Sequence, residues 1–185
     1  MIRKALFLSL LLLGFGACVP TREAGPKDLS TEPISLPFKF ETVEILDKRD
    51  TLLPMNWDTP FMSARKRAWV GNPALDPATK QDLESQLRRS EKADGIPAQV
   101  EFRLLEGICK INADWKSVTE YAQCKGELYV KVPGRNLVYH AFAEMYIENP
   151  TMNGTEKHTL VLYRQALKNV TFLTLQQVKK ELKLE

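Results

Sequence analysis

Two histidines are the residues of this 185-residue chain whose chemistry is easiest to examine. His140 and Glu144 stand four residues apart, with Phe142 between them, in a segment that alternates like a β-strand, so both side chains point to one face. Residues four apart on a strand are separated by about 13 Å, which is too far to share a metal ion without further ligands. We therefore expect His140 and His158 to be ordinary surface or core side chains, and we expect no metal site.

Acidic side chains offer a second kind of chemistry, because two carboxylates that face each other across a cleft can cleave a glycosidic bond. The candidates are Glu41, Glu44, Glu101 and Glu106, and nothing in the sequence selects two of them. The motifs of serine hydrolases, P-loop proteins, dinucleotide-binding proteins and zinc proteases do not occur in the sequence. We expect a protein that is not an enzyme and needs no cofactor, with a carboxylate-dependent envelope hydrolase as an alternative.

A cluster of aromatic and basic residues has the composition of an interaction surface. Aromatic anchors beside cations can contact anionic headgroups, glycans or a protein partner. The alternative is a loop that folds over the edge of a sheet with its charges in water. The residues of this candidate surface are Trp57, Phe61, Arg65, Lys66, Arg67 and Trp69.

The N-terminus has the three regions of a secretory signal peptide. Arg3 and Lys4 precede an apolar stretch over residues 5–13, and small residues follow up to Cys18. The apolar stretch is too short to span a bilayer of roughly 30 Å. Residues 1–17 are therefore predicted to be a signal peptide that is removed.

The residues before Cys18 resemble the lipobox of bacterial lipoproteins, in which small residues precede a cysteine that is lipidated and becomes the new N-terminus. Gly16 and Ala17 fit this pattern, whereas Phe15 stands where the family usually has Leu. The resemblance covers the first eighteen residues and implies a diacylglyceryl anchor on Cys18, with a third acyl chain such as palmitate on its amine. Several acyl chains hold a protein stably on a membrane. Because Val19 rather than Asp follows, the resemblance implies the outer membrane, with the protein facing the periplasm.

Two N-glycosylation triplets support a competing interpretation, a secreted eukaryotic protein. They begin at Asn153 and Asn169. Such triplets arise often by chance, and Asn169 falls inside a helical pattern, so we favour the bacterial interpretation.

The segment after the anchor is rich in proline, at positions 20, 26, 33 and 37, and it has little hydrophobic pattern. This composition predicts a flexible linker. We expect residues 18–37 to tether a single α+β periplasmic domain, residues 38–185, to the membrane. The alternative is that part of the linker lies on the domain as an irregular strand.

Cys109 and Cys124 remain as a pair once Cys18 is assigned to the lipid. In an exported protein such a pair is most simply a disulfide. A redox pair usually needs a close C-x-x-C motif, which is missing here. We expect a structural disulfide.

Net charge and composition limit the classes of partner. Without the leader, basic and acidic residues nearly balance, which gives no electrostatic argument for nucleic-acid binding. The fractions of hydrophobic and charged residues, 44% and 26%, are typical of a globular domain.

Four segments alternate apolar and polar residues as half-buried strands do. They cover residues 38–46, 97–109, 126–132 and 137–147. The turn sequence at residues 133–136 predicts that the last two segments form a hairpin. Residues 48–73 are expected to be irregular.

Two helices are predicted. The first has Asp76 as N-cap, Pro77 at its first position and Gly95 beyond its end. The second follows Thr155 with a period near 3.6, and Thr174-x-x-Gln177 resembles a capping box, which predicts a break there. Together these elements predict an α+β fold, an antiparallel sheet with a long C-terminal helix packed on one face in a two-layer sandwich.

The order of elements over residues 38–182 resembles the small α+β lipoproteins of the YajG type and the auxiliary lipoproteins of ABC-type transport systems. This implies a membrane-anchored, non-enzymatic binding, assembly or accessory module in the bacterial cell envelope. Its partners are the lipid membrane, through acylated Cys18, and an envelope protein that docks on the aromatic and basic cluster or on an open sheet edge. The first alternative is a carrier or chaperone for lipid or another apolar ligand, and the second is the envelope hydrolase.

Overall fold

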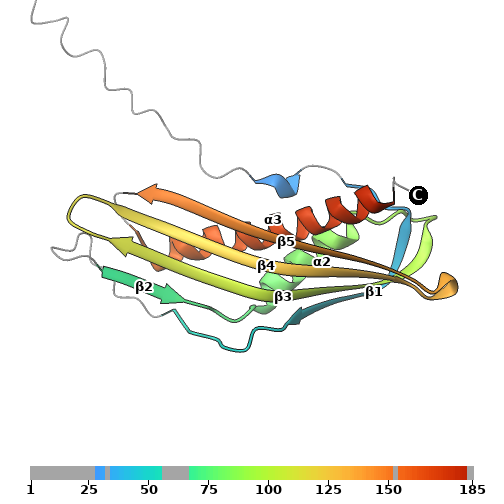
Figure 1. Ribbon diagram of the computed structural model, residues 1–185, viewed down its shortest axis with the longest axis horizontal. Coiled ribbons are helices and arrows are strands. Elements are labelled where there is room, and N and C mark those ends of the chain that lie inside the picture. The colour runs from blue at the N-terminus through green and yellow to red at the C-terminus, as the bar shows by residue number, and fades with distance from the viewer. Residues whose placement is uncertain (1–27, 32–33, 56–66, 152–153, 183–185) are drawn as a thin grey trace, which may run out of the picture.

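A long twisted sheet and a layer of helices build the protein (Figure 1). The computed structural model describes residues 28–31, 34–55, 67–151 and 154–182. In these ranges the helices are η1 (Leu29–Thr31), α2 (Pro77–Arg88), η2 (Pro133–Arg135) and α3 (Glu156–Glu181). The strands are β1 (Phe38–Asp47), β2 (Arg67–Gly71), β3 (Ile96–Ala113), β4 (Val118–Val132) and β5 (Leu137–Thr151). Because α2 and α3 lie on the same face of the sheet, the predicted two-layer α+β sandwich is confirmed.

The sheet is mixed rather than wholly antiparallel, which corrects one part of the prediction. The strand order is β1-β3-β4-β5, and β2 also pairs with β3. β1 runs parallel to β3 because α2 carries the chain across between them, whereas the other pairs are antiparallel. β4 and β5 form the predicted hairpin, with Asn136 in the left-handed conformation at its turn (φ 53°).

The region expected to be irregular contains a strand. β2 pairs with the second half of β3, from Gly71 opposite Cys109 to Arg67 opposite Ala113, while β1 occupies the first half. This segment has no alternation of apolar and polar residues. It becomes a strand because β3 extends well beyond β1 and offers an edge with unpaired backbone groups.

The N-terminal segment contacts the domain before Phe38. Leu36 is buried, its N–H donates to the Ser90 carbonyl oxygen at 2.8 Å, and the Leu29 N–H donates to Asn169 Oδ1 at 2.9 Å. Ile34 also packs against the core. Described residues between Asp28 and Pro37 therefore contact the helical layer, but they form the short helix η1 and irregular chain rather than the irregular strand of the alternative.

The helix α2 begins as predicted and ends earlier. The Asp76 side chain accepts from the Thr79 N–H at 2.7 Å, and Pro77 occupies the first turn. Leu83 and Leu87, one turn apart, are fully buried and form a narrow apolar stripe on this helix. The chain then leaves the helix after Arg88 and turns toward Gly95, next to the start of β3.

The predicted break in the C-terminal helix is wrong. α3 is continuous through Thr171 and Thr174, whose hydroxyls donate to the carbonyl oxygens of Leu167 and Thr171 at 3.0 and 2.9 Å. A threonine that bonds back to the preceding turn remains in a helix. Both threonines are buried, so packing against the sheet overrides their weak helix propensity.

The core fills the space between α3 and the sheet. Phe102, Leu128, Leu167 and Val170 are fully buried there. Gly126 in β4 allows the close approach, because a Cβ at this position would lie 2.7 Å from the Phe102 ring and 3.0 Å from the Val170 side chain.

Candidate functional site

The predicted aromatic and basic surface is only partly described. Trp57, Phe61, Arg65 and Lys66 lie outside the described residues, as does Cys18. Arg67 is exposed at the start of β2. Trp69 is half-buried and packs against a small cluster of Ile111, Ala113 and Val118. Of the two described members, only Arg67 is exposed.

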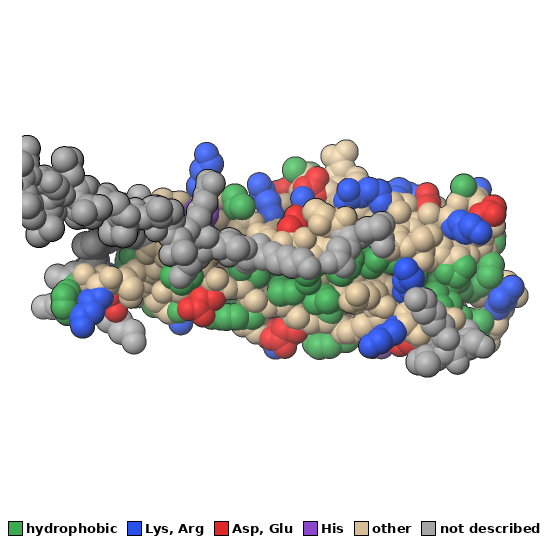
Figure 2. Space-filling view, turned by 90° about the horizontal axis from the view of Figure 1, so that it is seen from above, with side chains coloured by type: hydrophobic (Ala, Val, Ile, Leu, Met, Phe, Trp, Pro, Cys, Tyr) green, Lys and Arg blue, Asp and Glu red, His purple; other side chains and the backbone are tan. Residues whose placement is uncertain are grey.

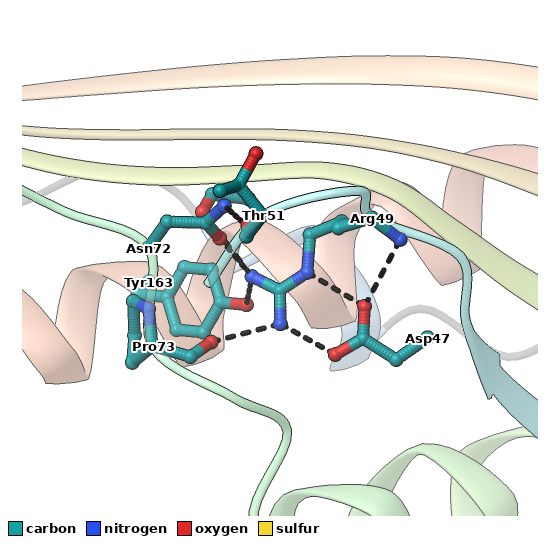
Figure 3. A network of polar contacts seen from close by, with 7 residues as sticks. Asp47, Arg49, Thr51, Asn72, Pro73 and Tyr163 are labelled. Carbon is teal, nitrogen blue, oxygen red and sulfur yellow. Dashed lines mark hydrogen bonds and ion pairs between the residues drawn. The ribbon is translucent and has the colours of Figure 1, made fainter. Parts of the chain in front are cut away.

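A buried arginine organises the irregular chain between β1 and α2 (Figure 3). The Arg49 side chain is 2% exposed, and each of its donor nitrogens has an acceptor. Nε and Nη2 donate to the two carboxylate oxygens of Asp47 at 2.7 and 2.6 Å, and Nη2 also donates to the Pro73 carbonyl oxygen at 2.8 Å. Nη1 donates to Asn72 Oδ1 and, at 3.1 Å, to the Tyr163 hydroxyl. We call these residues the Arg49 cluster.

The Arg49 cluster joins segments that are far apart in the sequence, since Arg49 and Tyr163 are 114 residues apart. The hydrogen bonds from Arg49 hold the pKa of Asp47 below its ordinary value of 3.8. Gly107 provides the necessary room, because a Cβ there would lie 2.7 Å from the Tyr163 hydroxyl oxygen and 2.9 Å from Arg49 Nη1. With all its donors committed, the cluster is a structural junction. Sequence patterns gave no signal for it.

Cys109 and Cys124 lie close to this junction on the buried face of the sheet. Both are free thiols in this structure and both are fully buried. In the register of β3 and β4, Cys124 faces Gly107 and Cys109 faces Ala122, so the two are diagonal neighbours. Diagonal neighbours have Cα atoms about 7–8 Å apart, slightly beyond the usual span of a disulfide. The disulfide stays a prediction, and it requires a local shift of the strands.

Burial controls the chemistry of these thiols. It raises the pKa of Cys109 to about 12 and the pKa of Cys124 above its ordinary value. A thiol must lose its proton to act as a nucleophile or metal ligand, so both side chains are inert while the protein is folded.

A buried carboxylate anchors the N-terminus of α3. Glu120 in β4 is fully buried and accepts from the Thr155 N–H at 3.0 Å and from the Thr159 hydroxyl at 3.3 Å. His158 Nδ1 and the Asn149 amide also contact it. A negative charge at a helix N-terminus is stabilising. His158 is thus an exposed side chain, 49% accessible, that contacts a buried carboxylate. We call this group the Glu120 cluster.

The other face of the sheet carries a ladder of paired charges. Glu101 accepts from Arg103 Nε at 2.5 Å and from Lys131 Nζ at 2.9 Å, and these hydrogen bonds lower its pKa. Arg103 lies 4.3 Å from the centre of the Tyr129 ring, which stacks on His140 at 4.5 Å. Farther along, Lys125 Nζ lies between Glu106 at 2.9 Å and Glu144 at 3.8 Å. No described helix covers this face, which we call the open face.

The carboxylates and histidines considered as candidates for glycoside cleavage or metal binding do not form such a site in this ladder. Glu44 and Glu101 are neighbours in the register of β1 and β3. A general acid for glycoside cleavage needs a raised pKa, whereas that of Glu101 is lowered. Among the described residues, no group of three or more His, Cys, Asp or Glu side chains is placed to hold a metal ion.

A cleft of about 350 Å³ interrupts the open face. It is lined by Ile108, Lys110 and Asn112 of β3, Tyr121 and Gln123 of β4, and Tyr146 of β5. The rings of Tyr121 and Tyr146 lie 5.8 Å apart. Among the described residues, no carboxylate pairs with the Lys110 ammonium group. The cleft thus has two aromatic walls, two side-chain amides and the unpaired Lys110 ammonium group. These groups suit a ligand in which an apolar side chain lies next to an acidic group.

A row of exposed apolar residues runs along β5 beside this cleft. Val138, Phe142 and Tyr146 all point to the open face and are exposed. β5 is an edge strand, and no described strand pairs with its outer edge. In the view onto this edge, acidic and basic side chains are interspersed along the molecule (Figure 2). Sequence alternation located the strand, but it did not show which of its faces the helices leave open.

Comparisons with protein-family models, with curated proteins and with solved structures found no match for this chain. Within the described residues, no helix combines the length and the apolar composition that crossing a membrane requires.

Proposed function

We propose that this protein is a lipid-anchored, non-enzymatic binding module of the bacterial cell envelope, held through acylated Cys18 in the outer membrane and facing the periplasm. In this proposal it docks an envelope protein partner on the open face, along β5. The anchor rests on the order of charged, apolar and small residues that ends at Cys18.

The observation that carries the docking role is the row of Val138, Phe142 and Tyr146 on an unpaired edge strand. Exposed apolar residues gathered on one element mark interaction sites, and an extended segment adds to a sheet edge through main-chain hydrogen bonds. The partner segment is expected to place apolar side chains along this row. It also carries an acidic side chain for Lys110, which lines the neighbouring cleft.

Two observations favour this role over the alternatives. The space between α3 and the sheet is filled by large side chains such as Phe102 and Leu167, which argues against a carrier that holds an apolar ligand there. The cleft on the open face has no acidic residue in its lining, which argues against a carboxylate-dependent hydrolase acting at that place.

Site-specific photo-crosslinking in intact cells tests the docking role. A photoreactive amino acid replaces Phe142 on the open face (44% exposed) or Val161 on the outside of α3 (51% exposed) in otherwise identical chains. We expect a discrete cross-linked protein from position 142 and none from position 161. Equal products from both positions, or products from neither, would contradict docking on the open face.

Mass spectrometry of the mature protein tests the anchor. We expect the N-terminal peptide to begin at Cys18 and to carry the mass of a diacylglyceryl group with a further acyl chain. A mature chain with unmodified Cys18 would refute the lipoprotein assignment.

A further inference from the structure

A second cavity lies on the opposite side of the molecule from the open face. It measures about 330 Å³ and is bordered by the end of α2, the C-terminal half of α3 and residues Ser30, Thr31 and Ile34 near η1. Ile34, Phe172 and Leu175 form an apolar wall, and Gln86 and Arg89 contribute polar groups. This volume is at the lower end of the range for small-ligand sites.

Gln86 is the first sign that a ligand belongs here. The residue is 5% exposed, and its Nε2 donates to the Lys168 carbonyl oxygen at 2.9 Å. Its Oε1 is buried and has no hydrogen-bond partner. The reverse orientation of the amide would place Oε1 against the Lys168 oxygen, so the acceptor is the atom left unpaired. Buried polar atoms in native proteins are almost always paired, which makes this one a candidate contact for a donor from outside.

Arg89 is the second sign. Its guanidinium forms no ion pair with any described residue, although the side chain lines the cavity. The preceding residue, Arg88, donates to Glu84 at 2.9 Å one helical turn away. Two adjacent arginines therefore differ in one respect: Arg88 is paired on the helix surface, and Arg89 is available at the mouth of the cavity.

We propose that this cavity binds the carboxyl-terminal end of a peptide. Arg89 pairs with the terminal carboxylate, Gln86 Oε1 accepts the N–H of the last peptide bond, and an apolar last side chain packs against Phe172 and Leu175. Arginine is well suited to carboxylates because its planar donors match the two oxygens. The inference does not depend on the open face, which lies across the sheet.

The unpaired acceptor of Gln86 favours a peptide carboxyl terminus over a fatty acid as the ligand. Both have a carboxylate and an apolar part, but a fatty acid has no N–H group that could satisfy Gln86 Oε1. A peptide end provides the donor, the anion and the apolar side chain together, so it complements all three features of the cavity.

Calorimetric titration of the full-length protein in detergent tests the proposal with four probes. They are N-acetyl-alanyl-leucine, its C-terminal amide, the ester analogue in which oxygen replaces the leucine N–H, and hexanoate. We expect the free acid to bind, the amide to bind about 10-fold more weakly, and the ester to bind about 5-fold more weakly. Hexanoate is expected to bind more weakly than all the peptides.

Three variants locate the binding in this cavity. Arg89→Gln is expected to weaken the free acid about 10-fold and to leave the affinity of the amide unchanged, because only the acid uses the charge. Gln86→Met should make the affinities of the free acid and its ester analogue equal, because the acceptor for the leucine N–H is then missing. Arg88→Gln, the matched control, should leave all four affinities as in the wild type.

Three results would overturn the proposal. They are equal affinities of the acid and its amide, hexanoate binding as tightly as the peptide, and no binding of the free acid at a concentration of about 10 mM. None of them bears on docking at the open face, which the cross-linking experiment tests separately.

Discussion

Arg49 and Arg89 have opposite hydrogen-bonding states in this fold. Arg49 is buried, and its donors are committed to Asp47, Asn72, Pro73 and Tyr163. Arg89 is exposed at a cavity and pairs with none of the described residues. The first arginine holds the chain together, whereas the second has its hydrogen-bonding capacity free for another molecule.

The difference extends to the neighbours of each arginine. Around Arg49 the acceptors come from three separate parts of the chain, at residues 47, 72–73 and 163, so the cluster exists only once the fold has formed. Beside Arg89, the buried Oε1 of Gln86 lacks a partner even in the folded state. A saturated polar cluster is typical of a structural role, and an unsaturated one is typical of a binding role. The following variants test that distinction.

Arg49→Met is expected to cause the largest loss of stability, about 3–5 kcal/mol, because it removes a buried guanidinium and leaves the partly buried Asp47 carboxylate and the other acceptors without their donor. Arg89→Met, the matched change at the other arginine, is expected to change stability by less than about 0.5 kcal/mol. Urea unfolding of both variants measures the free energies. Losses of stability of similar size in the two variants would contradict a structural role for Arg49 alone.

Glu120→Gln tests the other saturated cluster. An amide has one acceptor oxygen fewer for the Thr155 N–H, the Thr159 hydroxyl and His158, so we expect a loss of about 2 kcal/mol. Glu144→Gln on the open face is the control, because that carboxylate is exposed. A control that loses as much stability as Glu120→Gln would show that burial of the carboxylate is not what matters.

The pH dependence of stability isolates the pairing of Asp47 with Arg49. The pKa of Asp47 is lowered in the folded protein, so its contribution is complete above the ordinary value of 3.8 and is lost as the pH falls toward the folded-state pKa. We expect the difference in unfolding free energy between the wild type and Arg49→Met to shrink below about pH 4. Other acidic groups are common to both proteins and cancel in this difference. A difference that stays constant down to pH 2 would contradict the pairing.

Thiol labelling examines the two cysteines beside the Arg49 cluster. In protein prepared without reductant, we expect no label even after denaturation, because the predicted disulfide blocks both thiols. After reduction, the folded protein should react about a thousandfold more slowly than a Ser85→Cys variant does at its exposed position, since burial raises the pKa of both thiols. Labelling of Cys109 or Cys124 in the denatured, unreduced protein, located by peptide mass spectrometry, would disprove the disulfide.

The smallest effect is expected for Gln86→Met. The change removes the unpaired Oε1 together with the hydrogen bond from Nε2 to the Lys168 oxygen, so the two contributions nearly cancel. We expect the free energy of unfolding to change by less than about 0.5 kcal/mol in urea denaturation. A loss of more than about 2 kcal/mol would place Gln86 with the structural clusters instead.

Local patterns predicted the elements of this fold well where each segment carries its own signal. The hairpin of β4 and β5 follows from alternation and the turn residues, and α2 follows from Asp76 and Pro77. The parallel pairing of β1 with β3 does not follow, because alternation specifies a face and not a partner. β2 depends on the unpaired end of β3, and the continuity of α3 depends on hydroxyl groups that bond back to the helix.

The candidate sites were harder to foresee because they are assembled from distant residues. Val138, Phe142 and Tyr146 are visible in the sequence as one face of a strand, but only the placement of α3 shows that this face is open. The pair of Gln86 and Arg89 looks like an ordinary polar helix end until the fold places residues near η1 beside it.

The most direct test of the proposed function is a membrane pull-down that compares the wild type with Phe142→Asp and Val161→Asp. The two changes introduce the same charge at exposed apolar positions on opposite layers of the molecule. If the open face docks an envelope protein, Phe142→Asp loses the partner and Val161→Asp retains it, with both variants folded. Recovery of the same partner by Phe142→Asp and the wild type would contradict the proposal.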